Sequence, residues 1–169
     1  MGLLVPGMKR RLVALVVALT SLLGVQGPLA RVAHASVDVA AAELQLIDLL
    51  NADRAAAGLQ PLAADPRLMD VARWRSEDMV SRNFFSHDLG GFNVGRLLRE
   101  RQIPFNLAGE NIVSNTFDDA ATVAAAQVEL MKSPDHRQNV LRADYNAVGV
   151  GVAVGPNRRT VYTQIFIQS

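Results

Sequence analysis

The feature that most constrains the fold of this chain is a period-two alternation near its C-terminus. From Ala147 to Val154 small and β-branched residues alternate, Gly155-Pro156-Asn157 follows as a turn sequence, and Thr160 to Gln168 alternates again. Successive side chains of a β-strand point to opposite faces, so two such runs joined by a short turn predict a β-hairpin. We expect a small antiparallel sheet in which Ile112-Val113 belongs to a third strand.

The earlier part of the chain has helical periodicity instead. Apolar residues recur at helical spacing over residues 43–58, 65–82, 93–101 and 118–131. Asp65-Pro66 places a capping side chain before a proline at the first helical position, Asp118 or Asp119 caps the last helix, and Ser133-Pro134 starts a further short turn. Helices at the front and strands at the back predict an α+β domain with helices packed on the sheet.

The first 35 residues have the pattern of an export signal. Lys9-Arg10-Arg11 is a basic region, Leu12 to Val25 is an apolar run, and Ala33-His34-Ala35 has the small-x-small pattern that a signal peptidase recognises. The alternative is an uncleaved membrane anchor, but the run is short for a span, which needs about 20 residues. We therefore predict cleavage after Ala35 and a secreted protein that is not attached to a membrane afterwards.

Removing this signal changes the charge balance. Four of the 17 basic residues and none of the 16 acidic residues lie in residues 1–35, which leaves 13 basic and 16 acidic residues and a formal charge of −3. Such a domain has no electrostatic footprint for nucleic acid or anionic lipid. The chain contains no cysteine, which excludes thiol catalysis, iron–sulfur clusters and thiolate zinc sites. We expect a short lead-in at residues 36–42 and one domain at residues 43–169.

Two histidines and one glutamate are the candidate site residues. His87 closes the segment Phe84-Phe85-Ser86-His87 on a predicted loop, His136 lies just beyond a predicted helix cap, and Glu110 stands between Gly109 and Asn111. Imidazoles titrate near neutral pH and are the commonest metal ligands, and a carboxylate can orient an imidazole or bind a metal itself. The trio therefore predicts a polar cleft for a ligand or for a divalent metal such as zinc.

Each of these residues also has a structural interpretation. His87 can be a surface imidazole in a turn, and Glu110 can be an exposed acid in another. We expect Arg137 and Asn139 to tie the following loop to the domain through backbone hydrogen bonds. No HExxH or similarly tight spacing links the trio, and no G-x-S-x-G motif indicates a serine hydrolase. The residues alone predict an exported α+β domain with a His/Glu site.

Eight short motifs follow one another in order between Leu44 and Phe166. They are Leu49-Leu50-Asn51 with Arg54, Gly58-Leu59-Gln60-Pro61-Leu62, Asp65 with Leu68, Phe84-Phe85-Ser86-His87, Gly109-Glu110-Asn111-Ile112, Ser133-Pro134 with His136-Arg137 and Asn139, Val148-Gly149-Val150-Gly151, and Tyr162-Thr163-Gln164-Ile165-Phe166. In this order they resemble the cysteine-free bacterial branch of the CAP superfamily, which contains cysteine-rich secretory proteins, antigen 5 and plant pathogenesis-related proteins.

The resemblance implies a three-layer α-β-α sandwich with a central antiparallel sheet. It also implies a large cleft with two histidines and two acids, at which some members bind divalent metal. His87 matches the family's first histidine and Glu110 its first acid. Arg137, Asn139 and Gln164 match as residues of structural motifs.

Two positions depart from that pattern. The second acid normally follows a tryptophan, but here Leu130 takes the tryptophan's place, Ser133 falls where the acid is expected, and Glu129 lies on a different helical face. Members outside the bacterial branch have their second histidine where this chain has Val161, whereas the bacterial branch has it at His136. The resemblance thus implies a site of three residues rather than four.

For function, the resemblance implies several roles, among them sterol or lipid binding, extracellular signalling or inhibition, and proteolysis. We expect a non-catalytic extracellular binding module whose cleft accepts a lipid, a peptide, a partner protein or a metal. The alternative is a metal- or His/Glu-dependent extracellular hydrolase, for which the sequence supplies no nucleophile and only one carboxylate as general base. A structural or adhesive role outside the cell is a third hypothesis.

Overall fold

The computed structural model describes residues 37–91, 93–116 and 121–169. Its elements follow the chain in the order α1 (Val39–Ala56), β1 (Ala63–Ala64), α2 (Pro66–Ser81), α3 (Val94–Glu100), β2 (Leu107–Asn115), α4 (Ala121–Lys132), α5 (Pro134–Val140), β3 (Ala147–Val154), the 3-10 turn η1 (Pro156–Arg158) and β4 (Thr160–Gln168). The predicted export signal and the cap predicted at Asp118 or Asp119 lie outside the described residues.

The C-terminal hairpin predicted from the alternation is confirmed. β3 and β4 pair antiparallel, with Val154 opposite Thr160 next to the turn, and β2 pairs antiparallel with the other edge of β4. The sheet order is β1-β3-β4-β2. β1 is an addition to the prediction: its two residues pair in parallel with the start of β3, so only three of these four strands are antiparallel.

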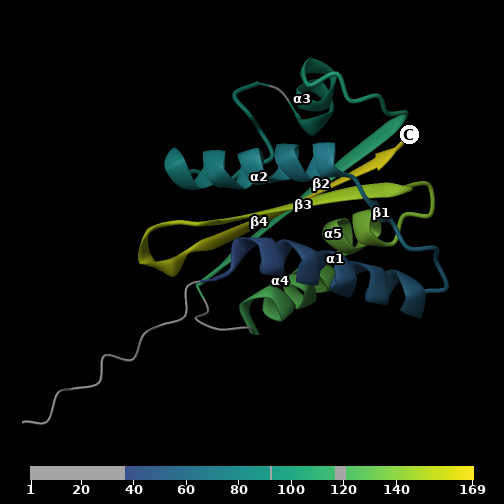
Figure 1. The fold of residues 1–169 in the computed structure, drawn as a ribbon, viewed down its shortest axis with the longest axis horizontal. Coiled ribbons are helices and arrows are strands. Elements are labelled where there is room, and N and C mark those ends of the chain that lie inside the picture. Colours follow the sequence, from purple (N-terminus) through teal and green to yellow (C-terminus); the bar gives the residue numbers. More distant parts are fainter. Residues whose placement is uncertain (1–36, 92, 117–120) are drawn as a thin grey trace, which may run out of the picture. The chain divides into compact units, whose positions relative to one another are not determined.

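Helices cover both faces of this sheet, which makes the three-layer α-β-α sandwich (Figure 1). α2 and α3 lie on one face, and α1, α4 and α5 lie on the other (Figure 1). One buried cluster joins α2 and α3 to alternate sheet residues such as Ile165 and Ile167, and another joins α1, α4 and α5 to the residues between them, such as Phe166. The side chains on both faces of β4 are therefore buried.

Local sequence signals set the ends of the helices. Asp65 accepts a hydrogen bond from the amide of Arg67 and Pro66 opens α2, as predicted, and Asn93 caps α3 in the same way. α1 begins at Val39 rather than at Glu43, because the Asp38 side chain accepts a hydrogen bond from the Ala41 amide. The lead-in expected at residues 36–42 is therefore largely the first turn of a helix.

The glycines of β3 explain how closely α2 lies on the sheet. A Cβ atom added at Gly149 would overlap the backbone of Leu68, and one added at Gly151 would overlap that of Ala72 and Arg73. The valines that alternate with these glycines, Val148, Val150 and Val152, point to the other face and are buried under α1. The small/β-branched alternation of this strand thus lets a helix backbone rest on one face and fills a side-chain core on the other.

Candidate functional site

A buried ion pair forms the base of the site. The side chains of Arg75 on α2 and Glu110 on β2 are 0% and 4% exposed. Arg75 donates from Nε to Glu110 Oε1 at 2.7 Å and from Nη2 to Oε2 at 3.3 Å. The same Nη2 donates to the carbonyl of Ser86 at 2.8 Å, which fixes the loop after α2. Arg75 therefore positions both the acid and the segment that carries His87.

His87 stands over this pair at the surface. Its Nδ1 lies 2.8 Å from Glu110 Oε2, and its side chain is 53% exposed. Carboxylate oxygens accept hydrogen bonds, so Nδ1 carries the proton in this contact, and in the neutral form of the ring Nε2 is then the acceptor nitrogen. Glu110 thus holds the imidazole from its buried side, the arrangement in which a carboxylate orients a metal-binding histidine.

The structure brings His136 to the same place. This residue is on α5, and the centroid of its ring lies 6.3 Å from that of His87 with the ring planes at 53°. Burial lowers the pKa of His136, the nearby His87 lowers it further, and Asp135 opposes the shift. His136 therefore favours the neutral form, in which one ring nitrogen has a lone pair, and its ring lies beside that of His87.

A chain of buried amides holds α5 in position. Asn111 Nδ2 donates to the carbonyl of His136 at 3.0 Å and to Gln164 Oε1 at 3.1 Å. Asn139 donates to Asn111 Oδ1 at 2.8 Å and to the carbonyl of Glu110 at 3.3 Å. Gln164 continues the chain to Gln127 on α4 at 3.0 Å. These contacts join Asn139 and Gln164 in one network and fix His136 relative to β2.

Arg137 differs from this expectation. Its side chain is exposed, and the loop after α5 is tied down by Arg54 instead. Arg54 Nη1 donates to the carbonyls of Val140 at 2.8 Å and Arg142 at 2.9 Å, and its Nε donates to that of Gln60 at 2.9 Å. A buried arginine on α1 thus performs the task that the sequence interpretation gave to an arginine on the segment itself.

Gly109 is required by close packing. A Cβ atom at this position would overlap the hydroxyl of Tyr145 and would lie 3.0 Å from Asn139 Oδ1. Tyr145 is buried and stacks on Phe166 with ring centroids 5.4 Å apart, so it has little room to move. The glycine before Glu110 therefore lets α5 and the following loop approach β2 closely, as its neighbourhood in the sequence suggested.

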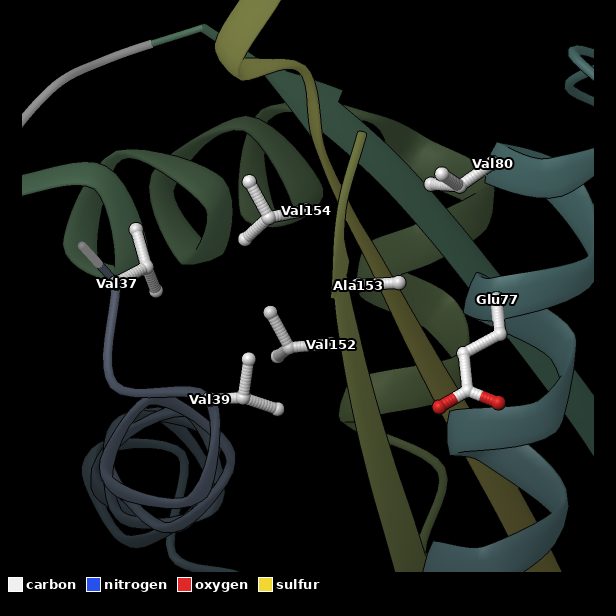
Figure 2. A pocket seen from close by; sticks show the side chains of 7 residues that line it. All are labelled: Val37, Val39, Glu77, Val80, Val152, Ala153 and Val154. Carbon is white, nitrogen blue, oxygen red and sulfur yellow. The ribbon is translucent and has the colours of Figure 1, made fainter. Parts of the chain in front are cut away.

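His87 and Glu110 open onto a pocket of about 420 Å³ between the loop, α3 and β2. Its other lining residues are Asn93, Val94, Gly95, Arg99, Phe105, Ala108 and Gly109. A second pocket of the same volume holds no histidine. It is lined by Val37, Val39, Glu77, Val80, Val152, Ala153 and Val154, with Val37 and Val39 at the start of α1 facing Val152 and Val154 of β3 (Figure 2). Of these two pockets, only the first contains residues of the predicted trio.

Comparison with known proteins agrees with the motifs. The sequence pattern of the cysteine-rich secretory protein family, CAP, matches residues 47–166. The chain belongs to this family. Over 127 residues it is 38% identical to the uncharacterized membrane protein YlbC of Bacillus subtilis, covering 75% of the present chain and 34% of YlbC.

Two solved structures resemble this CAP domain closely. An extracellular protein containing an SCP domain from Bacillus anthracis is 33% identical with a TM-score of 0.66, and the match covers 78% of this chain and 41% of that one. An outer surface protein of Borrelia burgdorferi is 17% identical with a TM-score of 0.71, covering 80% and 98%. The second likeness concerns the fold alone. The chain spans less than half the length of its two Bacillus relatives.

The residues at the two departures from the family's pattern of site residues lie outside the His87–Glu110 contact. Leu130 is buried in α4, Ser133 is the first residue before α5 and makes no capping hydrogen bond with its side chain, and Val161 is buried in β4. Glu129 points to solvent, where it accepts a hydrogen bond from Lys132. None of these four residues therefore supplies a second carboxylate beside Glu110.

The donor set bears directly on metal binding. In residues 37–91, 93–116 and 121–169, no group of three His, Cys, Asp or Glu side chains is arranged to hold a metal ion. Both Glu110 oxygens already accept hydrogen bonds from Arg75 or His87. The trio thus contains two imidazoles as possible metal ligands, and a carboxylate that orients one of them, the ring of His87.

A membrane-spanning helix is also not found in the described part of the chain, where no helix combines the necessary length and apolar character.

Arg75 and Arg54 are the important residues that the sequence interpretation missed. Both fall on the apolar stripe of their helices, Arg75 between the buried residues Ala72 and Met79 and Arg54 after Leu50. A charge on the buried face of a helix requires a partner inside the protein. That spacing is the signal from which a buried ion pair could have been predicted, although not the identity of the partner.

Proposed function

We propose that this CAP domain is an exported, non-catalytic binding module whose ligand-binding face is built around His87 and His136. The two imidazoles hold a divalent metal ion, for which zinc is the first candidate. The observation that carries the proposal is the approach of the two rings to 6.3 Å while Glu110 holds Nδ1 of His87. Imidazole nitrogens are among the ligands by which proteins bind zinc.

Protonation supports a role for the imidazoles as ligands. A histidine binds metal in its neutral form, and the pKa of His136 is lowered by burial and by His87. His87 is fixed in the tautomer that leaves Nε2 free. Because the protein supplies two ligands rather than three, the remaining coordination positions belong to water or to a bound molecule, which suits recognition of a ligand that itself carries a donor atom.

The hydrolase alternative has less support from the geometry. A general base needs a carboxylate or imidazole free to accept a proton from the attacking group. Both oxygens of Glu110 accept hydrogen bonds from the buried Arg75, and Oε2 also contacts His87. The position of the second acid is taken by Ser133, and no described serine or threonine is paired with either histidine. Binding is therefore the function that these residues favour.

Export is supported by two independent features. Residues 1–35 have the basic, apolar and small-x-small pattern of a signal peptide. The structural relative from Bacillus anthracis is described as extracellular and that from Borrelia burgdorferi as an outer surface protein. We propose that this chain is secreted by the same general route.

Zinc titration by calorimetry tests the metal part. The exported protein without an affinity tag is expected to bind one equivalent, and His87→Ala/His136→Ala to bind none. Glu110→Gln should weaken binding by about 10–100-fold, the usual effect of losing a group that orients a metal ligand. Arg137→Gln, which removes an exposed charge beside His136, is the matched control and should bind as tightly as the unmodified protein.

Two results would contradict this proposal. Zinc binding that is equal in the double histidine variant, or absent in the unmodified protein, removes the metal site. Turnover of an unstructured protein substrate that disappears in both His87→Ala and Glu110→Gln would instead establish the hydrolase alternative.

A further inference from the structure

The pocket beside His87 is lined by two pairs of chemically different side chains. One pair is His87 with Glu110, and the other is Arg99 of α3 with Phe105. The guanidinium of Arg99 lies over the Phe105 ring, with Cζ 5.8 Å from the ring centroid. This arrangement places a cation and an aromatic ring together in the lining of the pocket.

The pocket carries a net positive charge. Glu110 is the only described acid that lines it, and its charge is compensated by Arg75. The nearest acid in sequence to Arg99 is Glu100, which pairs with Arg96 at 2.9 Å. Among the described residues Arg99 has no carboxylate partner. The guanidinium of Arg99 is therefore available to an anionic group of a ligand, and the only lining acid, Glu110, does not repel that group because Arg75 compensates its charge.

The remaining walls are apolar or lack side chains. Val94, Phe105 and Ala108 provide apolar surface, and Gly95 has no side chain to occupy the pocket. A Cβ atom added at Gly95 would lie 3.5 Å from Phe105 Cζ and 3.8 Å from Arg99 Nη1, both ordinary contact distances. The backbone of α3 at Gly95 thus lines the cavity next to the guanidinium of Arg99. The volume of about 420 Å³ is within the range of small-molecule sites.

We infer that this pocket binds a small organic carboxylate with an apolar body. The carboxylate pairs with the Arg99 guanidinium, the apolar body packs on Phe105 and Val94, and the far end of the molecule reaches His87. This inference rests on the proposed binding function and names the class of ligand. Two sources share the chemistry, namely an aliphatic acid and the C-terminal carboxylate of a peptide.

The test measures binding by two-dimensional amide NMR of the exported protein. Hexanoate and N-acetylphenylalanine are the probes for the two sources, and hexanamide is the uncharged match for hexanoate. A charge-assisted hydrogen bond predicts that hexanamide binds about tenfold more weakly than hexanoate, and that Arg99→Gln weakens the carboxylates by about the same factor.

Arg101→Gln is the matched control, because Arg101 also stacks on an aromatic ring, that of Trp74 at 5.4 Å, but does not line the pocket. It should leave the affinity within about twofold. Gly95→Leu should abolish binding by filling the cavity. This substitution removes no interaction and replaces a glycine inside a helix, so the variant should remain folded.

The outcomes are distinct from those of the zinc titration. The inference is overturned if neither carboxylate binds, if hexanamide binds as tightly as hexanoate, or if Arg99→Gln and Arg101→Gln lose affinity equally. Preference for one carboxylate identifies the source. Carboxylate binding that depends on Arg99 in a protein that binds no zinc would leave this inference standing and remove the metal site.

Discussion

Replacing Glu110 by glutamine should destabilise the fold strongly, because it leaves the buried charge of Arg75 without compensation. The two side chains are 0% and 4% exposed, and Arg75 Nη1 already lacks a hydrogen-bond partner among the described residues. Breaking such a pair costs about 3–5 kcal/mol. A domain of this size has roughly 5–15 kcal/mol of stability, so the substitution removes about a fifth of it or more.

Thermal and urea unfolding followed by circular dichroism measure this loss. At about 3–5 °C per kcal/mol for a domain of this size, Glu110→Gln should lower the midpoint by about 10–20 °C. The matched control is Glu100→Gln. Its partner is Arg96, and both side chains are exposed, 57% for Arg96 and 49% for Glu100, so the loss should stay below about 0.5 kcal/mol.

A second variant separates the uncompensated charge from other causes. In Arg75→Met/Glu110→Gln the buried cation is removed together with its partner, so part of the lost stability should return. Equal midpoints for Glu110→Gln and Glu100→Gln would refute the reasoning. A double variant that is less stable than the sum of its single variants predicts would also contradict it.

Three further predictions concern the surroundings of the site. The pKa of His136 is lowered in the folded state and stays near 6.5 in the unfolded chain, so stability should decline as the pH falls below about 6.5, and His136→Gln should flatten that part of the urea-denaturation profile. Gly109→Ala should cost about 1–3 kcal/mol in thermal unfolding, because the new methyl group overlaps the buried Tyr145 hydroxyl. Gln164→Leu should cost about 1–3 kcal/mol by leaving Asn111 and Gln127 with unsatisfied amides, and faster amide exchange in α5 would locate the effect.

The elements that the sequence predicted correctly depend on local signals. The hairpin follows from alternation around Gly155-Pro156, and α2 begins at a cap followed by proline, both of which act over a few residues. The start of α1 was placed too late because Asp38 stands before residues that look like a flexible lead-in. β1 was missed because its two residues form a strand only through pairing with β3, far along the chain.

The site was predictable to the extent that its residues lie in motifs. His87, Glu110 and His136 do approach one another, but their roles depend on long-range contacts. Arg75 and Glu110 are 35 positions apart, and nothing in either segment identifies the other as its partner. For the same reason Arg137 was given the task of Arg54, which acts on carbonyls 86 and 88 positions away.

The most direct test of the central claim is nitrogen-15 NMR of the imidazole rings in the protein without its predicted export signal. If the signal is cleaved after Ala35, His87 and His136 are the only histidines left, so each ring resonance has one of two origins. The account predicts that His87 carries its proton on Nδ1 and that one equivalent of zinc shifts an acceptor nitrogen of both rings. A proton on Nε2 of His87, or a zinc response confined to one ring or absent from both, would contradict it.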